Sequence, residues 1–181
     1  VKANREKTSL ANAGLGVVSH LYGMMFMSAI QIKLLTVPYK GTASAMNDLM
    51  GRQVGLLCDQ TTQTLKQIQG GTVKAYGVTT KARIASLPNL PTLAESGLPG
   101  FEVVVWQGIF APKGTPKPVI DRLAQSVQAA LKDPDVRKRL ADLGAEITPV
   151  EKQTPEALRG WLKAEIDKWV PVIRKAGVYA D

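Results

Sequence analysis

The sequence is poor in the residue types on which metal sites and catalytic centres most often depend. In 181 residues it has one histidine, His20, and one cysteine, Cys58. A single histidine excludes a metal site built from several histidines, and a single cysteine excludes an intrachain disulfide. Because no set of acid, base and nucleophile can be assembled around these two residues, the sequence argues against an enzyme.

Long apolar runs are also missing. The most apolar early stretch, residues 21–30, is too short to span a membrane and contains Met, Ser and Gly. Hydrophobic residues make up 45% of the chain and charged residues 21%, which is typical of a globular chain long enough to form a core. The first residue is Val and no signal peptide pattern opens the sequence, so we expect a processed or partial chain.

Acidic residues are outnumbered by basic ones, 15 to 23, which gives a formal net charge of +8. The densest basic run, Arg137-Lys138-Arg139, lies in a predicted helix with Asp135 and Asp142 nearby, which favours a solvated helix face. A basic nucleic-acid binder is the weaker alternative, because no motif combines aromatic with basic residues. We therefore expect no nucleic-acid partner.

Short apolar runs alternate with helical patterns through the first two-thirds of the chain. The predicted strands are residues 9–11, 34–37 (buried), 54–58, 73–78 and 102–110, and the predicted helices are one after residue 19, one at 42–50, and one from Thr61 or Thr62, as its N-cap, to residue 69. Residues 87–100, rich in Pro and Gly, are predicted to form a loop with one helical turn at residues 92–95. This rhythm is typical of an α/β fold with a parallel sheet covered on both faces.

The last third of the chain is predicted to be mostly helical. The expected elements are a helix with Thr115 as its N-cap, a helix opened by Asp133 and ended by Gly144, a short strand at 145–148, and a last helix opened by Thr154 and running to about residue 175. Apolar residues recur on one side of each of these helices.

A glycine-rich segment, residues 12–20, joins the first predicted strand to a helix. Such a turn exposes unpaired backbone N–H groups at a helix N-terminus, where the helix dipole favours an anion. The alternative is a tight turn that needs glycine only for its backbone conformation. Gly14 and Gly16 are not followed by the third glycine of a dinucleotide site or the Lys-Ser/Thr pair of a P-loop. His20 is expected to cap or pack on the helix.

Polar residues also follow the next two predicted strands. Tyr39 and Lys40 end the strand at 34–37 and would offer a hydroxyl and a cation to a ligand, or else be a half-buried ring and a solvated amine. Asp59 ends the strand at 54–58 and would cap the following helix or accept from a ligand. In open α/β sheets ligands bind outside the carboxyl ends of the strands, so these residues are candidates for one site.

Taken together, these segments resemble the Bug (TctC-type) receptors of the tripartite tricarboxylate transporters along essentially the whole chain. The residues that carry the resemblance are Ala13-Gly14-Leu15-Gly16-x-x-Ser19-His20-Leu21, Val37-Pro38-Tyr39-Lys40-Gly41, Asp48-Leu49-Met50-Gly51-x-Gln53-Val54, Asp59, Gly77-Val78-Thr79-Thr80-Lys81-Ala82-Arg83, Leu87-Pro88-x-Leu90-Pro91-Thr92-Leu93-Ala94-Glu95-Ser96-Gly97, Trp106-Gln107-Gly108-Ile109-Phe110-Ala111-Pro112-Lys113-Gly114-Thr115-Pro116 and Ala176-Gly177-Val178.

The resemblance implies a periplasmic-binding-protein-like α/β fold. Residues 1–103 would form the second, ligand-binding lobe with a mostly parallel sheet, and residues 104–181 a crossover strand and C-terminal helices that normally complete the first lobe. It implies a periplasmic, non-enzymatic receptor without a cofactor, which passes a small carboxylate to the membrane permease subunits of its transporter. The implied ligand-binding residues are Ala13, Gly14, Gly16, Val17, Ser19, His20, Tyr39, Lys40, Gly41 and Asp59.

The sequence departs from the family pattern at several positions. The family's opening segment is absent before residue 1, and residues 2–4 resemble the tail of a helix. Val17 stands where the family usually has Ser or Thr, Gly55 where it has Asp, Arg52 where it has Gly, and Arg5 where it has Pro. With half of the cleft missing, we expect weak or no binding by this chain alone. The exposed first-lobe contact surface of the C-terminal helices should drive self-association or leave those helices mobile. The alternative is a truncated paralogue that acts as a protein-interaction module without solute binding.

Overall fold

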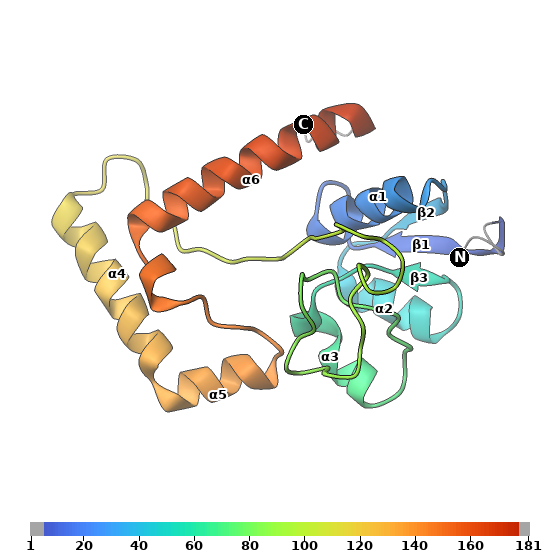
Figure 1. Cartoon of the computed structure of the whole chain (residues 1–181), viewed down its shortest axis with the longest axis horizontal. Helices are drawn as coiled ribbons and strands as arrows, with labels where there is room; N and C mark the ends of the chain where they lie inside the picture. The colour runs from blue at the N-terminus through green and yellow to red at the C-terminus, as the bar shows by residue number, and fades with distance from the viewer. Residues whose placement is uncertain (1–5, 178–181) are drawn as a thin grey trace. The chain divides into compact units, whose positions relative to one another are not determined.

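The structure, a computed structural model, describes residues 6–177 (Figure 1). The chain divides into two compact units, residues 1–105 with 172–181 and residues 106–171, and each is considered by itself. The predictions for residues 2–4, Arg5 and Val178 lie outside the described residues. No helix in the described part of the chain is long and apolar enough to cross a membrane.

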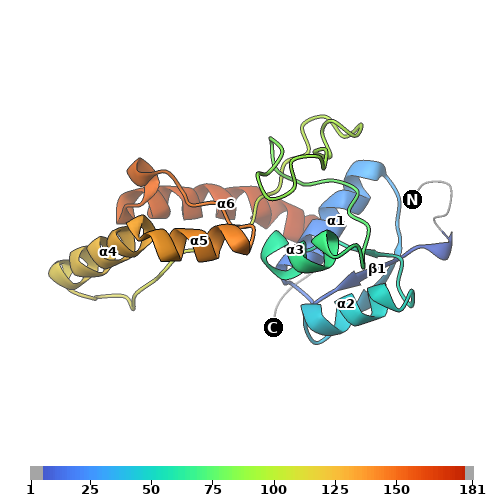
Figure 2. The ribbon, with the colours of Figure 1, turned by 90° about the horizontal axis from the view of Figure 1, so that it is seen from below.

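The first unit is built on a three-stranded parallel sheet in the order β2-β1-β3. Strands β1 (Ser9–Asn12), β2 (Leu35–Pro38) and β3 (Leu56–Leu57) are each followed by a helix, α1 (Val18–Ile30), α2 (Thr42–Met50) and α3 (Thr61–Gln69). The chain crosses from β1 to β2 in one direction along the sheet and from β2 to β3 in the opposite direction. Because both connections are right-handed, α1 and α2 lie on opposite faces of the sheet. Figure 2 shows these two helices on either side of β1. The expected α/β fold with a parallel sheet is confirmed.

The core of this unit lies around the central strand. Leu10 and Ala11 of β1 are 1% and 0% exposed, and Ala11 packs with Ala45 of α2 and with Val54. A glycine brings α1 close to the strand, since a Cβ at Gly23 would lie 2.7 Å from Leu10 Cδ2. The sheet therefore holds α1 and α2 in place at the end where the strands finish.

Several predicted strands are wrong. Residues 73–78 contain only an isolated bridge from Val78 to Thr92, and residues 102–110 and 145–148 have no strand in the structure. Within 102–110, Val103 makes two hydrogen bonds with Thr79. Its N–H donates to the Thr79 carbonyl (2.9 Å), and its carbonyl accepts from the Thr79 hydroxyl (2.6 Å). Apolar, β-branched sequence forms a strand only where a neighbouring strand pairs with it, and the described residues supply none there.

Two predicted strands form but differ in burial or length from the prediction, and the predicted loop turn is confirmed. The strand predicted to be buried, at 34–37, is an edge strand of the described sheet, and Leu35 is 72% exposed. Strand β3 is shorter than the predicted 54–58. The predicted turn at 92–95 is present, because the Thr92 N–H donates to Glu95 Oε2 (2.7 Å) and the Glu95 N–H to Thr92 Oγ1 (3.0 Å).

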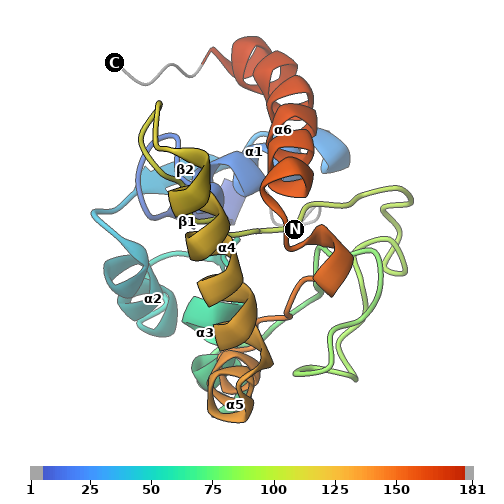
Figure 3. The ribbon, with the colours of Figure 1, turned by 90° about the vertical axis from the view of Figure 1, so that its left-hand side faces the viewer.

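The second unit, residues 106–171, contains α4 (Lys117–Lys132), α5 (Pro134–Asp142), the 3-10 helix η2 (Val150–Lys152) and most of α6 (Pro155–Ala176). Figure 3 looks along α5, with α4 crossing it. The predicted caps of α5 and α6 are confirmed: Asp133 accepts from the N–H groups of Asp135 and Val136, and the Thr154 hydroxyl accepts from that of Ala157.

Two other predicted caps are wrong by one residue. Helix α4 has Pro116 as its N-cap, and the Thr115 hydroxyl donates to the Pro112 carbonyl instead of capping the helix. Helix α3 has Gln60 rather than Thr61 or Thr62 at this position. In α4 the N-cap is Pro116, whose backbone is fixed, and in α3 the carboxylate of Asp59 directly precedes the N-cap. Each shifts the start of its helix without changing the helix itself.

Candidate functional site

The carboxyl ends of the three strands meet at one edge of the sheet, the carboxyl edge, because the strands are parallel. The connections that leave these ends lie side by side. The Tyr39 N–H after β2 donates to the Asn12 carbonyl at the end of β1 (2.8 Å). The Thr42 hydroxyl at the start of α2 donates to Asp59 Oδ2 after β3 (2.7 Å). The N-termini of α1, α2 and α3 therefore gather at the carboxyl edge.

None of these three helices has a side-chain cap or an acidic residue in its first turn. Their N-cap residues are Val17, Gly41 and Gln60, none of which makes a side-chain capping bond, and none of the helices has an acidic residue in its first turn. First-turn N–H groups have no intrahelical partner, and the helix dipole adds partial positive charge beside them. Such an arrangement attracts an anion.

The glycine-rich loop between β1 and α1 is held by side chains. The N–H groups of Ala13, Gly14 and Gly16 donate to Ser19 Oγ (2.8 Å), Asn12 Oδ1 (3.0 Å) and His20 Nδ1 (3.1 Å). This corrects the expectation that the turn leaves its N–H groups unpaired. For the N–H groups of Val18 and Ser19, in the first turn of α1, the described residues supply no partner. The N–H groups of Leu15 and Val17 also lack a partner among the described residues, and Ser19 is only 2% exposed, so the unpaired donors extend from the loop into the buried first turn of α1.

His20 packs on α1 as predicted. It is buried, and its Nδ1 accepts from Gly16, so the proton of the neutral ring lies on Nε2. Burial lowers the pKa of His20 from the usual 6.5. The ring therefore contributes an acceptor that fixes the loop, and no positive charge near neutral pH.

Asn12 is a candidate that the sequence reasoning missed. Its side chain is 1% exposed, and its Oδ1 is committed to Gly14, which fixes the orientation of the amide. Its Nδ2 is buried with no partner among the described residues. A buried donor without a partner is a group that a bound anion or water would satisfy. A polar residue that ends an otherwise buried strand is the sequence signal that could have identified it.

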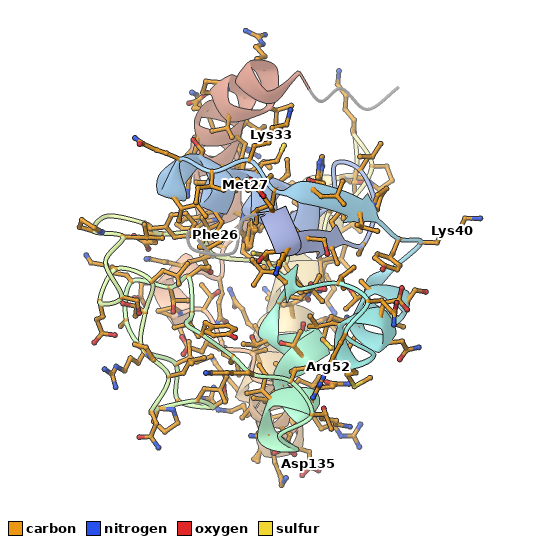
Figure 4. The ribbon with its side chains drawn as sticks, turned by 90° about the vertical axis from the view of Figure 1, so that its right-hand side faces the viewer. Phe26, Met27, Lys33, Lys40, Arg52 and Asp135 are labelled. Carbon is orange, nitrogen blue, oxygen red and sulfur yellow. The ribbon has the colours of Figure 1, made fainter. Side chains whose placement is uncertain are left out.

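The predicted residues after β2 take different positions. The Tyr39 hydroxyl donates to Asp48 Oδ2 (2.7 Å), and this bond raises the pKa of Tyr39, so its proton is already engaged. Lys40 is exposed, and Figure 4 shows its side chain pointing away from the ribbon. Gly41 is the N-cap of α2 with φ of 136°, a conformation that favours glycine. A ligand-binding role for these residues stays a prediction.

Asp59 braces two of the three helix starts. Its Oδ2 accepts from Thr42 at the start of α2 and its Oδ1 from the N–H of Gln60, the N-cap of α3 (2.8 Å). A negative charge is therefore already in place beside α2 and α3, which leaves α1 as the open N-terminus. The neighbouring Cys58 is unreactive, because burial raises the pKa of its thiol to about 12. Within residues 6–177, no cluster of His, Cys, Asp and Glu could hold a metal ion.

The family departures lie at different ends of this sheet. Val17 is at the carboxyl edge, as the N-cap of α1, and is 40% exposed. Gly55 precedes β3 at its amino end, where its N–H donates to the Ser9 carbonyl (3.2 Å). Of these two positions, Val17 is the one that changes the chemistry of the carboxyl edge.

Comparison with known proteins gives consistent matches over the whole chain. The profile of a family described as tripartite tricarboxylate transporter family receptor matches residues 1–178. The UPF0065 protein encoded in the TAR-I ttuE-ttuC' intergenic region of Agrobacterium vitis is 45% identical over 98% of this chain and 51% of its own length. The chain thus spans about half the length of this relative and of a second UPF0065 protein, from Pseudomonas sp. (strain P51), which is 40% identical over 96% of this chain and 52% of its own length.

Two solved structures have the same fold as this chain. The periplasmic binding protein BugD is 54% identical with a TM-score of 0.89, and the match covers 100% of this chain and 60% of BugD. MatC from Rhodopseudomonas palustris, solved with bound malate, is 36% identical with a TM-score of 0.87, over 96% of this chain and 59% of MatC.

Proposed function

The chain belongs to the tripartite tricarboxylate transporter receptor family, and we propose that it binds a small carboxylate at the carboxyl edge of its sheet, on the N-terminus of α1. The observation that carries this proposal is the meeting of three uncapped helix N-termini, of which only that of α1 lacks an anion beside it. The N–H groups of Val18 and Ser19 would donate to the carboxylate oxygens. The malate bound by MatC supports a carboxylate as the ligand class.

The expected affinity of this chain alone is low. A carboxylate at a helix N-terminus gains roughly 0.3–1 kcal/mol from the dipole, and a charge-assisted hydrogen bond adds about 1.5–3 kcal/mol. Even the upper end of this sum, about 4 kcal/mol, corresponds to a dissociation constant of only about 1 mM. Tighter binding would need further contacts of the kind that the rest of a full-length relative supplies.

The family match supports two further parts of the proposal. Solved members are named periplasmic binding proteins and solute binding proteins, so we place this receptor in the periplasm and give it no catalytic role. As a receptor of a tripartite transporter, it would pass its carboxylate to membrane permease subunits.

A second candidate function is a protein-interaction module without solute binding. It is favoured by the apolar side chains that residues 106–171 leave exposed, among them Phe110 (61%), Ile109 (68%) and Trp161 (45%). Such surfaces mark contacts with other polypeptides, including a second copy of the chain. Light scattering after size exclusion tests it: a monomer at all concentrations argues against self-association.

An amide-resolved NMR titration with malate, citrate and hexanoate tests carboxylate binding. We expect saturable shifts of the Val18 and Ser19 backbone amides and of the Asn12 side-chain amide. The amides of Asp135 and Val136 are an internal control, because Asp133 already occupies the N-terminus of α5. A well-dispersed spectrum in which no acid shifts the α1 amides selectively would overturn the proposal.

One substitution removes a proposed donor without breaking the helix. Val18→Pro deletes the N–H at the first position of α1, where proline is tolerated, and the preceding Val17 already has the extended backbone that proline requires (ψ 169°). Carboxylate shifts at α1 should be lost. Lys117→Pro is the matched control at the first position of α4 and should leave the titration unchanged.

A further inference from the structure

The carboxyl edge also indicates which kind of carboxylate suits this chain. Resting on the carboxylate binding proposed above, we infer that the preferred ligand is a monocarboxylate with an apolar skeleton, whose carboxylate binds the first turn of α1 while its carbon chain packs on Leu15 and Val17.

The residue at the N-cap of α1 gives the first argument. An N-cap Ser, Thr, Asp or Asn normally accepts from the second or third N–H of the helix, which here means Ser19 or His20. The Val17 side chain has no acceptor, so the Ser19 N–H lacks a capping partner, and the methyl groups of Val17 stand where a capping oxygen would lie. Val17 is 40% exposed and Leu15 is 74% exposed, so apolar surface lies on the loop that leads into the helix.

The buried amide of Asn12 gives the second, independent argument. Its Nδ2 is a donor without a partner in a residue that is 1% exposed, and the bond that Oδ1 accepts from Gly14 fixes this amide beside the β1–α1 loop. The N–H groups of Val18 and Ser19 and this Nδ2 are three donors without a partner among the described residues. Donors without acceptors suit an acceptor-only carboxylate better than a hydroxyl, which also needs to donate.

A second carboxylate on the ligand would find, among the described residues, no positively charged side chain bonded to the loop at α1 that could offset its loss of hydration. Within the described chain, the side chains bonded to residues 13–19 are Asn12, Ser19 and His20, so no Lys or Arg is bonded to this loop. Lys40 points away from the ribbon (Figure 4), and Asp59 already places a negative charge beside α2 and α3. The free-energy cost of removing an unpaired carboxylate from water is much larger than that of removing a methyl group.

The test compares hexanoate with adipate, which have the same number of carbons and differ only in a terminal methyl or carboxylate. Affinities come from the NMR titration of the Val18 and Ser19 amides of the intact chain. We expect hexanoate to bind about tenfold tighter than adipate. Binding of both acids with adipate equal or tighter would overturn this inference and leave carboxylate binding in place. Failure of both acids with binding of malate or citrate would overturn this inference alone, and failure of all four acids would overturn the proposed function as well.

Two variants locate the preference on Val17. Val17→Ala removes methyl groups without adding a polar atom and should weaken hexanoate about fourfold, the share of one buried methylene, while adipate stays unchanged. Val17→Ser adds a hydroxyl that competes for the Ser19 N–H and should weaken both acids. Val119→Ser, at an exposed valine of α4 (48%), is the control and should change neither affinity. An unchanged hexanoate-to-adipate ratio in Val17→Ala would contradict the assignment.

Discussion

The two units of this chain are stabilised in opposite ways. In the first unit, β1 and its neighbours bury Leu10 and Ala11, yet α1, α2 and α3 begin without side-chain caps. In residues 106–171 none of the described side chains is buried, yet α5 and α6 begin with Asp133 and Thr154 as working caps. Caps stabilise a helix locally, whereas a core depends on contacts between elements.

The difference explains where function can reside. A core strong enough to hold helices in place can leave their first-turn N–H groups open to a ligand, and the first unit does so at its carboxyl edge. The second unit lacks such a core, so its helices depend on local signals and on few contacts, such as the bonds of Trp106 and Trp169 Nε1 to Glu165 Oε2 (3.3 and 3.0 Å). The comparison can be tested by matched changes in the two units.

The largest expected effect comes from matched leucine truncations. Leu10→Ala in β1 removes a fully buried side chain and should cost about 2–5 kcal/mol of unfolding free energy. Leu123→Ala in α4, where the side chain is 44% exposed, should cost about 1 kcal/mol or less. Urea unfolding followed by circular dichroism measures both. Equal costs would show that the apolar residues of the second unit are buried in solution, for example by self-association.

A pair of helical glycines should respond with opposite sign. Gly23→Ala places a Cβ 2.7 Å from Leu10 Cδ2, so α1 must move from β1, at a cost of roughly 1–3 kcal/mol. Gly160→Ala in α6 meets no atom within 4 Å and should stabilise that helix by about 0.5–1 kcal/mol. The same urea experiment reads both changes. A stabilising Gly23→Ala would mean that α1 does not pack on β1 as closely as described.

The sequence predicted helices better than strands, for a physical reason. Helix α2 spans Thr42–Met50 as predicted, because the turn residues and glycines that begin and end a helix act within a few residues. The strands predicted at 73–78 and 102–110 failed, because strand formation depends on a partner that the local sequence does not contain. The family was recognised because several motifs occurred in the same order along the chain, which does not depend on pairing.

The meeting of these segments at the carboxyl edge was predictable from the sequence, whereas their hydrogen bonds were not. The glycine-rich loop and the residues after β2 and β3 do meet at the carboxyl edge. Hydrogen bonds between side chain and loop could not be predicted, since Ser19 and His20 hold the N–H groups that appeared free. The unpaired Nδ2 of Asn12 depends on burial by neighbouring elements, which becomes visible only in the folded chain.

Removing a cap from the second unit and adding one to the first should have moderate and opposite effects on unfolding free energy, and the added cap should abolish carboxylate binding. Asp133→Ala removes the cap of α5 and should destabilise the chain by about 1 kcal/mol. Val17→Asp places a cap and a negative charge at α1, whose N-cap residue already has the extended backbone that caps adopt, and should stabilise by about as much while abolishing carboxylate binding. Chemical unfolding and the NMR titration check the two effects. Retained carboxylate binding in Val17→Asp would place the ligand elsewhere.

The smallest expected effect is a pH dependence confined to the first unit. Burial lowers the pKa of His20 below 6.5 in the folded chain, so the unfolded chain binds this proton more readily, and stability should fall as the pH drops below 6.5. Protonation would also remove the Nδ1 acceptor from Gly16 and loosen the loop at α1. His20→Gln keeps an acceptor but cannot titrate. Its unfolding free energy should therefore fall less than that of the unsubstituted chain when the pH is lowered through 6.5. An equal loss in both proteins near pH 6.5 would show that His20 is not its source. Carboxylates such as Glu95, whose pKa is lowered from 4.5 by the bond from Arg83, lose their contribution only below pH 4.5.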